Sequence, residues 1–183
     1  MHMLEKPNYA HNKKVGLEKN TIINGQGCGK VAQMKYGFFH MSYNGCEMIA
    51  LHNSMVLTGR ESDLAEVCLE MYPKCQSLSG VFGSVPYLLG SFYKTRDIPY
   101  KYTMSYNKFF DMLPEYDCAV LSFWNPPSKP WNGLHTVAVK YVNGKIRIYN
   151  RSNGRNYPVE YTTREEFMPD KTDFICAYLI NNE

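Results

Sequence analysis

The chain has 183 residues, of which 44% are hydrophobic and 20% are charged. These values are typical of one globular domain and exclude a disordered, collagen-like or coiled-coil chain. Twenty lysines and arginines against 17 aspartates and glutamates leave a net charge of +3, which is too small and too scattered to indicate a nucleic-acid partner or an anionic membrane surface.

The N-terminal residues 1–20 are polar and predict a flexible arm, which leaves residues 21–183 as a single domain. The arm lacks the apolar segment of a secretory signal, and no apolar run approaches the roughly 18 residues that a membrane-spanning helix needs. The sequence as written therefore predicts a cytoplasmic protein with no membrane span, or a secreted one whose signal has been removed. It leaves the oligomeric state open.

Helical patterns fill the middle of the chain. The segment from Cys46 to Leu57 is apolar on nearly all sides, which predicts a buried helix. Ser62, Ser84 and Ser105 are suitable N-cap residues for three further helices, each followed by apolar residues at helical spacing.

Strand patterns occupy the last third of the chain. The expected strands cover residues 117–123, 134–142, 145–150, 157–161 and 174–180. Helices followed by an antiparallel sheet predict an α+β fold.

The Asn143-Gly144 pair between two alternating apolar runs predicts a two-residue type I′ hairpin. In this register one face of the hairpin is apolar and the other is polar, and Val137 lies opposite Asn150. His135 and Asn150 then become diagonal neighbours at the open end of the apolar face. An amide in that place can bind one ring nitrogen and leave the other free to move a proton.

Cys46 is the best candidate for a group on which this histidine acts. It lies in the first turn of the predicted buried helix, where unpaired N–H groups and the helix dipole favour a thiolate. Cys46, His135 and Asn150 together predict a nucleophile, a base and an orienting group. Taken singly, they are also consistent with a core thiol, an edge histidine and a turn-forming asparagine.

Asn44-Gly45-Cys46-Glu47 at the start of an apolar helix, followed much later by the His135 strand, resembles the papain-like cysteine peptidases. Within that superfamily the chain is most similar to free-standing relatives of the bacteriocin-processing peptidases, which remove double-glycine leaders. The resemblance covers about residues 36–154. It implies a papain-like fold, in which an N-terminal helical half with a central buried helix starting at the nucleophile faces a C-terminal antiparallel sheet.

The resemblance also implies a reaction. Cys46 is the nucleophile, His135 the base and Asn150 the orienting residue, and the acyl-enzyme is released by water. The substrate is a peptide or protein, and no cofactor is required. The family usually has a glutamine shortly before the nucleophile that helps to hold the oxyanion, and here the corresponding position is His40. The expected donors are therefore His40 or the backbone N–H groups of Gly45 and Cys46; the alternative is that catalysis is impaired.

Two further segments are candidates for a role near this site. Trp124 and Trp131 flank a proline-rich loop before His135 and are expected either to form a wall of a substrate groove or to cover the edge of the sheet. The stretch Gln26-Gly27-Cys28-Gly29 is similar to the one that precedes the nucleophile of papain itself. No catalytic cysteine follows it at the family's spacing, so we interpret it as a glycine turn.

Two other functions stay open beside cysteine hydrolysis. One is transfer of the acyl group to an amine, as in transglutaminases; the other is a catalytically inactive papain-like domain that binds peptide through the tryptophan-containing loop. Most of the six cysteines are expected to be buried, reduced thiols, and His52 is expected to be structural. The dispersed histidines, without a paired cysteine motif, predict no metal site.

Overall fold

The computed structural model describes residues 4–75, 83–125 and 133–182 and has a mixed α+β fold. The α-helices are α1 (Glu5–Val15), α2 (Met41–Asn44), α3 (Cys46–Leu57), α4 (Leu64–Cys75), α5 (Gly90–Lys94), α6 (Tyr106–Met112) and α7 (Arg164–Phe167). The strands are β1 (Lys35–Tyr36), β2 (Phe39–His40), β3 (Tyr100–Thr103), β4 (Cys118–Trp124), β5 (Leu134–Val142), β6 (Lys145–Tyr149), β7 (Val159–Tyr161) and β8 (Phe174–Ile180).

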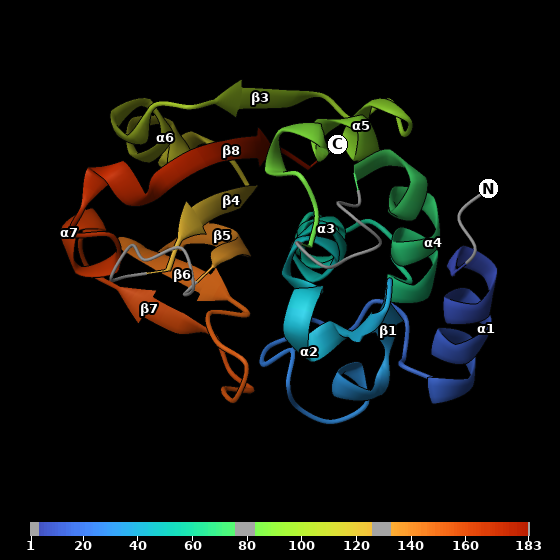
Figure 1. Cartoon of the computed structure of the whole chain (residues 1–183). Coiled ribbons are helices and arrows are strands. Elements are labelled where there is room, and N and C mark those ends of the chain that lie inside the picture. The colour runs from blue at the N-terminus through green and yellow to red at the C-terminus, as the bar shows by residue number, and fades with distance from the viewer. Residues whose placement is uncertain (1–3, 76–82, 126–132, 183) are drawn as a thin grey trace.

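An antiparallel sheet with the strand order β3-β8-β4-β5-β6-β7 forms one half of the described molecule. Helices from the first half of the chain form the other half, and α3 lies between the sheet and α4 (Figure 1). The strand at the junction is β5, against which α3 packs.

The hairpin between β5 and β6 has the predicted register as far as the Ala138–Tyr149 pair, but the predicted Val137–Asn150 pair is not formed, because Asn150 leaves the strand with a φ of 61°. Val142 pairs with Lys145, and Val139 pairs with Ile148. Asn143 and Gly144 have φ angles of 52° and 79°, the left-handed pair that a type I′ turn requires.

The hairpin face that the pattern predicts to be polar is buried at its inner end. Thr136, Ala138 and Tyr149 are buried on this face, because α3 packs on it; only its outer end carries the exposed or half-buried Lys140 and Arg147. The sheet is therefore covered on both faces, and its buried side chains divide into two clusters. One cluster joins the sheet to α3 and α4, and the other includes residues of α6 and α7.

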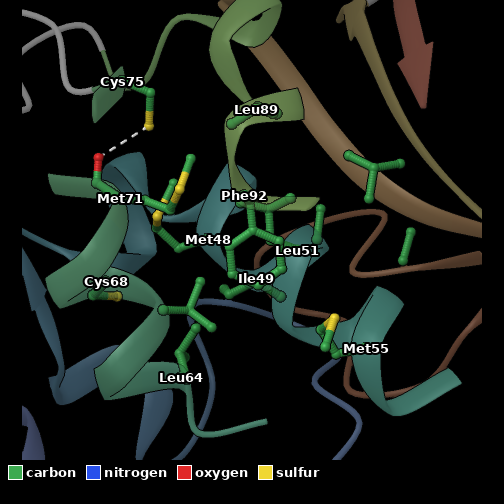
Figure 2. Packing of buried hydrophobic residues seen from close by; sticks show 14 of the residues in the cluster. Met48, Ile49, Leu51, Met55, Leu64, Cys68, Met71, Cys75, Leu89 and Phe92 are labelled. Atoms are coloured by element: carbon green, nitrogen blue, oxygen red, sulfur yellow. Dashed lines mark hydrogen bonds between the residues drawn. The ribbon is translucent and has the colours of Figure 1, made fainter. Parts of the chain in front are cut away.

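The predicted helix from Cys46 to Leu57 is confirmed with the same bounds. Its apolar residues interlock with those of α4 and with Leu89 and Phe92 (Figure 2). At the end of α4 the Cys75 thiol donates to the Met71 carbonyl at 3.3 Å. Burial on nearly all sides explains why this helix shows no polar face.

The N-terminal segment differs from the expected arm, because residues 5–15 form α1. Two buried side-chain amides attach this helix to the β1–β2 hairpin. Asn8 donates to the Gly37 carbonyl at 2.7 Å. Asn12 donates to the Lys35 carbonyl at 2.9 Å and accepts from the Lys35 N–H at 2.7 Å. Two of the polar side chains of this segment, those of Asn8 and Asn12, thus bind backbone groups rather than solvent.

The helix expected after Ser84 is divided into a 3-10 turn at Pro86–Leu88 and the short α5. At Gly90 the backbone of α5 approaches two tyrosines closely, since a Cβ there would lie 2.8 Å from the Tyr100 hydroxyl and 2.8 Å from a ring carbon of Tyr178. The helix expected after Ser105 is confirmed as α6, with the Ser105 hydroxyl accepting from a backbone N–H of its first turn.

Asn12→Ala is expected to lower the free energy of unfolding by about 2–3 kcal/mol, because it leaves the N–H and the carbonyl of Lys35 without their partner. Urea denaturation measures the change. Lys14→Ala, an exposed substitution on the same helix, is the control and should stay within about 0.5 kcal/mol of the wild type. Equal stability of the two variants would contradict the anchoring role of Asn12.

Candidate active site

Cys46 opens α3 directly behind the short helix α2. Gly45 makes this junction possible, since a Cβ at that position would lie 2.6 Å from the Met41 methyl carbon and 2.8 Å from its carbonyl oxygen. The Gly45 N–H donates to the same carbonyl at 2.9 Å, so it is already used. The N–H groups of the first turn of α3 have no partner within the helix ladder and point toward the Cys46 end.

The Cys46 thiol is buried, with 6% of the residue exposed. Its S–H donates to Oε2 of Glu47 at 3.2 Å, and the backbone amide of Thr136, the residue after His135, is close enough to favour the thiolate. Burial, followed by the Glu47 charge, outweighs that amide and raises the pKa of Cys46 well above its ordinary value. The resting thiol is therefore neutral.

His135 lies near the start of β5 on the sheet face opposite to α3, where its ring meets the Phe123 ring edge-on at a centroid distance of 5.9 Å. Its Nε2 lies 2.7 Å from the backbone carbonyl oxygen of Asn150. A carbonyl only accepts, so Nε2 carries the proton and Nδ1 keeps its lone pair in the neutral ring. Burial lowers the pKa of His135 to about 4, against the opposing effect of the Asn150 bond and with a smaller contribution from Arg151.

Asn150 contacts His135 as predicted, but through its backbone carbonyl and not through its carboxamide. The residue adopts a left-handed conformation with φ 61°, which ends β6 and turns the carbonyl toward the imidazole. Asparagine is one of the few residues that adopt this conformation readily. Its carboxamide instead binds Gln26, accepting from the Gln26 N–H and donating to Gln26 Oε1, both at 3.0 Å.

Gln26 is a site residue that the sequence interpretation missed. It is 3% exposed, and its Nε2 donates to the Ser42 carbonyl at 3.1 Å, so it links Asn150 to the α2 segment just before Cys46. The likeness of Gln26-Gly27-Cys28-Gly29 to the papain stretch was the available signal. The segment is a glycine turn, as expected, with the Cys28 N–H donating to the Gly25 carbonyl at 2.8 Å.

Glu47 is the second site residue that the sequence interpretation missed. Its carboxylate is buried, with 2% of the residue exposed, and it lies against the backbone of Gly83 and Ser84. A Cβ at Gly83 would be 3.4 Å from Oε1. Burial raises the pKa of Glu47 to about 7.

The remaining predicted site residues are His40, Trp124 and Trp131. His40 is exposed at the end of β2, one short helix away from Cys46. Trp124 is 41% exposed at the end of β4 and pairs with Leu134, the residue before His135. Trp131 lies outside the described residues.

His52 and most of the cysteines are buried, as the sequence predicts. Both ring nitrogens of His52 are hydrogen-bonded, to the Ser62 hydroxyl at 2.8 Å and to the Thr21 carbonyl at 2.9 Å, which agrees with a structural role. All six cysteines are free thiols, and all but Cys28 are buried.

Comparison of the chain with models of known protein families and with curated proteins found no match. Within the described residues, no group of three or more His, Cys, Asp or Glu side chains is arranged to hold a metal ion. In the same part of the chain, none of the helices combines the length and the apolar character needed to cross a membrane.

Asn150→Gly tests which atom orients His135. Glycine keeps the backbone carbonyl and suits the left-handed conformation, so the His135 Nε2–H tautomer should persist in ¹⁵N NMR spectra. Loss of the two bonds to Gln26 should lower the free energy of unfolding by about 2 kcal/mol. A change of tautomer would identify the carboxamide as the orienting group.

His135 and Glu47 should give opposite pH dependences of stability. The pKa of His135 falls from 6.5 to about 4 on folding, so its contribution is present above pH 6.5 and is lost as the pH falls toward 4. The pKa of Glu47 rises from 4.5 to about 7, so its contribution is present below pH 4.5 and is lost as the pH rises toward 7.

In urea denaturation between pH 4.5 and 6.5, the Glu47→Gln variant should therefore gain stability with pH more steeply than the wild type, and the His135→Gln variant less steeply. Each removed contribution is on the order of 3 kcal/mol, at about 1.4 kcal/mol for each pH unit between the folded and unfolded pKa values. Stability curves that run parallel to the wild-type curve would contradict the burial of these two groups.

Proposed function

We propose that the chain is a papain-like cysteine hydrolase, a peptidase that cleaves an amide bond with Cys46 as nucleophile, His135 as base and Asn150 as the orienting residue. One observation carries the proposal. The Cys46 thiol, at the start of the central buried helix, lies against the backbone of Thr136, and the preceding residue, His135, is bonded through Nε2 to Asn150. A helical half whose central helix packs against an antiparallel sheet, as α3 packs against β5, is the arrangement expected of the papain-like fold.

In the proposed reaction the Cys46 sulfur attacks the amide carbonyl carbon, and its proton passes to Nδ1 of His135. The described residues show no contact between these two side chains, so the transfer requires the imidazole to reach the sulfur around the start of β5. The C–N bond breaks as the imidazolium returns this proton to the leaving amine, which leaves a thioester on Cys46. Water then attacks the thioester, His135 again carries the proton, and the thiol and a carboxylic acid are released. Because the neutral ring has its proton on Nε2, the nitrogen that accepts the proton is the one not used by Asn150.

The oxyanion is assigned to the first turn of α3. The Gly45 N–H already donates to Met41, so the Cys46 N–H is the donor in this proposal, and the exposed His40 is placed outside it. Trp124, exposed beside the strand pair that carries His135, is the proposed contact for an extended peptide.

A second candidate is an inactive papain-like domain that binds peptide. It is favoured by the protonation states of the site, since burial keeps both the Cys46 thiol and the His135 imidazole neutral rather than as a thiolate–imidazolium pair. The two candidates differ in the reactivity of Cys46 toward a substrate-like electrophile.

Cys46→Ala is expected to abolish covalent labelling by a peptide that carries a thiol-directed electrophile, with an unchanged circular dichroism spectrum. Intact-protein mass spectrometry measures the labelling. Cys28→Ala, which removes the most exposed of the six thiols, is the matched control and should label as the wild type does. Equal labelling of the Cys46→Ala variant would reject the peptidase, and a wild-type Cys46 that reacts no faster than a free thiol would favour the inactive domain.

A further inference from the structure

The Glu47 carboxylate is the hydrogen-bond partner of the proposed nucleophile. The Cys46 S–H donates to Oε2 at 3.2 Å, and neither residue is more than 6% exposed. No lysine or arginine of the described part of the chain forms an ion pair with Glu47. A buried carboxylate without a cation, in contact with a thiol, calls for a role other than charge pairing.

We propose that Glu47 is a positioning residue that controls the ionisation of Cys46: its carboxylate accepts the S–H and keeps the sulfur protonated in the resting protein. This inference deepens the proposed function and rests on it for the role of Cys46 as nucleophile. The sulfur becomes reactive when Glu47 is neutral or has turned away, because a thiolate beside the carboxylate would place two negative charges in contact.

Among the residues that the structure describes, the groups that act on the pair carry no charge of their own. On the α4 side is Cys75, whose thiol pKa is raised by burial and, to a smaller extent, by the Glu47 charge. Cys75 and the Ser84 hydroxyl both contact the Tyr36 hydroxyl, at 3.8 Å and 3.1 Å. On the β5 side the Thr136 amide approaches the sulfur, and the neutral His135 precedes it.

The contact is held from both sides of the pair. The carboxylate lies against the backbone of Gly83 and Ser84, and also bonds to the N–H of its own residue. The sulfur is held by the start of α3, which Gly45 fixes against Met41. The two side chains therefore meet at a defined place and not through the free rotation of surface groups.

The test is the rate of Cys46 alkylation by iodoacetamide as a function of pH. In this reaction the sulfur forms a bond to the methylene carbon, iodide leaves, and the thiol proton passes to Glu47 or to water. The modified protein is cleaved with trypsin, and the peptide from residue 36 to 60 carries Cys46 as its only cysteine. The other five thiols therefore do not affect the measurement.

Glu47→Gln should move the midpoint of the pH profile down by at least one pH unit, which makes alkylation at pH 8 about tenfold faster than in the wild type. Glu47→Asp, which keeps the charge, should stay near the wild-type profile, whereas a merely structural role would make both substitutions behave alike. Glu66→Gln, which removes an exposed carboxylate from α4, is the control and should leave the profile unchanged. A Glu47→Gln profile that coincides with the wild-type profile overturns the proposal.

A measurement on the wild type keeps the proposal falsifiable if Glu47→Gln does not fold. The side-chain carboxyl carbon of Glu47, followed by ¹³C NMR, should titrate near pH 7, and the Cys46 β-carbon should titrate separately and well above that pH. Titration of the Cys46 β-carbon near the ordinary thiol value of about 8.5 would overturn the proposal. These outcomes are distinct from failure of the peptidase, which is decided by peptide labelling of the Cys46→Ala variant.

Discussion

The left-handed conformation of Asn150 is the constraint on which the candidate site depends. The chain leaves β6 at this residue, so the pairing with β5 ends at Ala138 and β6 does not pair with Thr136 or His135. The same turn directs the Asn150 carbonyl to the imidazole and its carboxamide to Gln26. One backbone conformation thus ends a strand, sets the tautomer of a histidine and joins the sheet to the N-terminal half of the chain.

Burial explains why the Cys46 thiol and the His135 imidazole are neutral at rest. Removal from water disfavours every charge, so it lowers the pKa of His135 and raises those of Cys46 and Glu47. An ion pair between the thiol and the imidazole would need hydrogen bonds that compensate for lost hydration. The Thr136 amide offers one such bond to the sulfur, but the adjacent carboxylate acts against it.

Local signals predicted the parts of the fold that depend on local chemistry. The Asn143-Gly144 turn determines the β5–β6 register, and the apolar run after Cys46 determines α3 with its bounds. Helix α1 could not be predicted in this way, because the partners that make Asn8 and Asn12 buried residues lie on another segment. The Gln26–Asn150 contact joins residues far apart in the chain, and no spacing rule indicates it. The choice of carbonyl over carboxamide depends on the backbone angle at Asn150, which the side-chain pattern does not specify.

The geometry of a helix explains why the proposed nucleophile has a carboxylate beside it. Successive residues of an α-helix point about 100° apart, so Cys46 and Glu47 cannot both face β5. The thiol faces the strand, and the carboxylate is turned toward Gly83 and Ser84. Residues 83–84 belong to the helical half of the molecule, whereas His135 belongs to the sheet. In the proposal above, residues 83–84 act on the sulfur through their contact with Glu47. In the proposed function, two parts of the fold therefore act on Cys46: the start of β5, where the pairing with β6 has ended, and the backbone of Gly83 and Ser84, against which Glu47 rests.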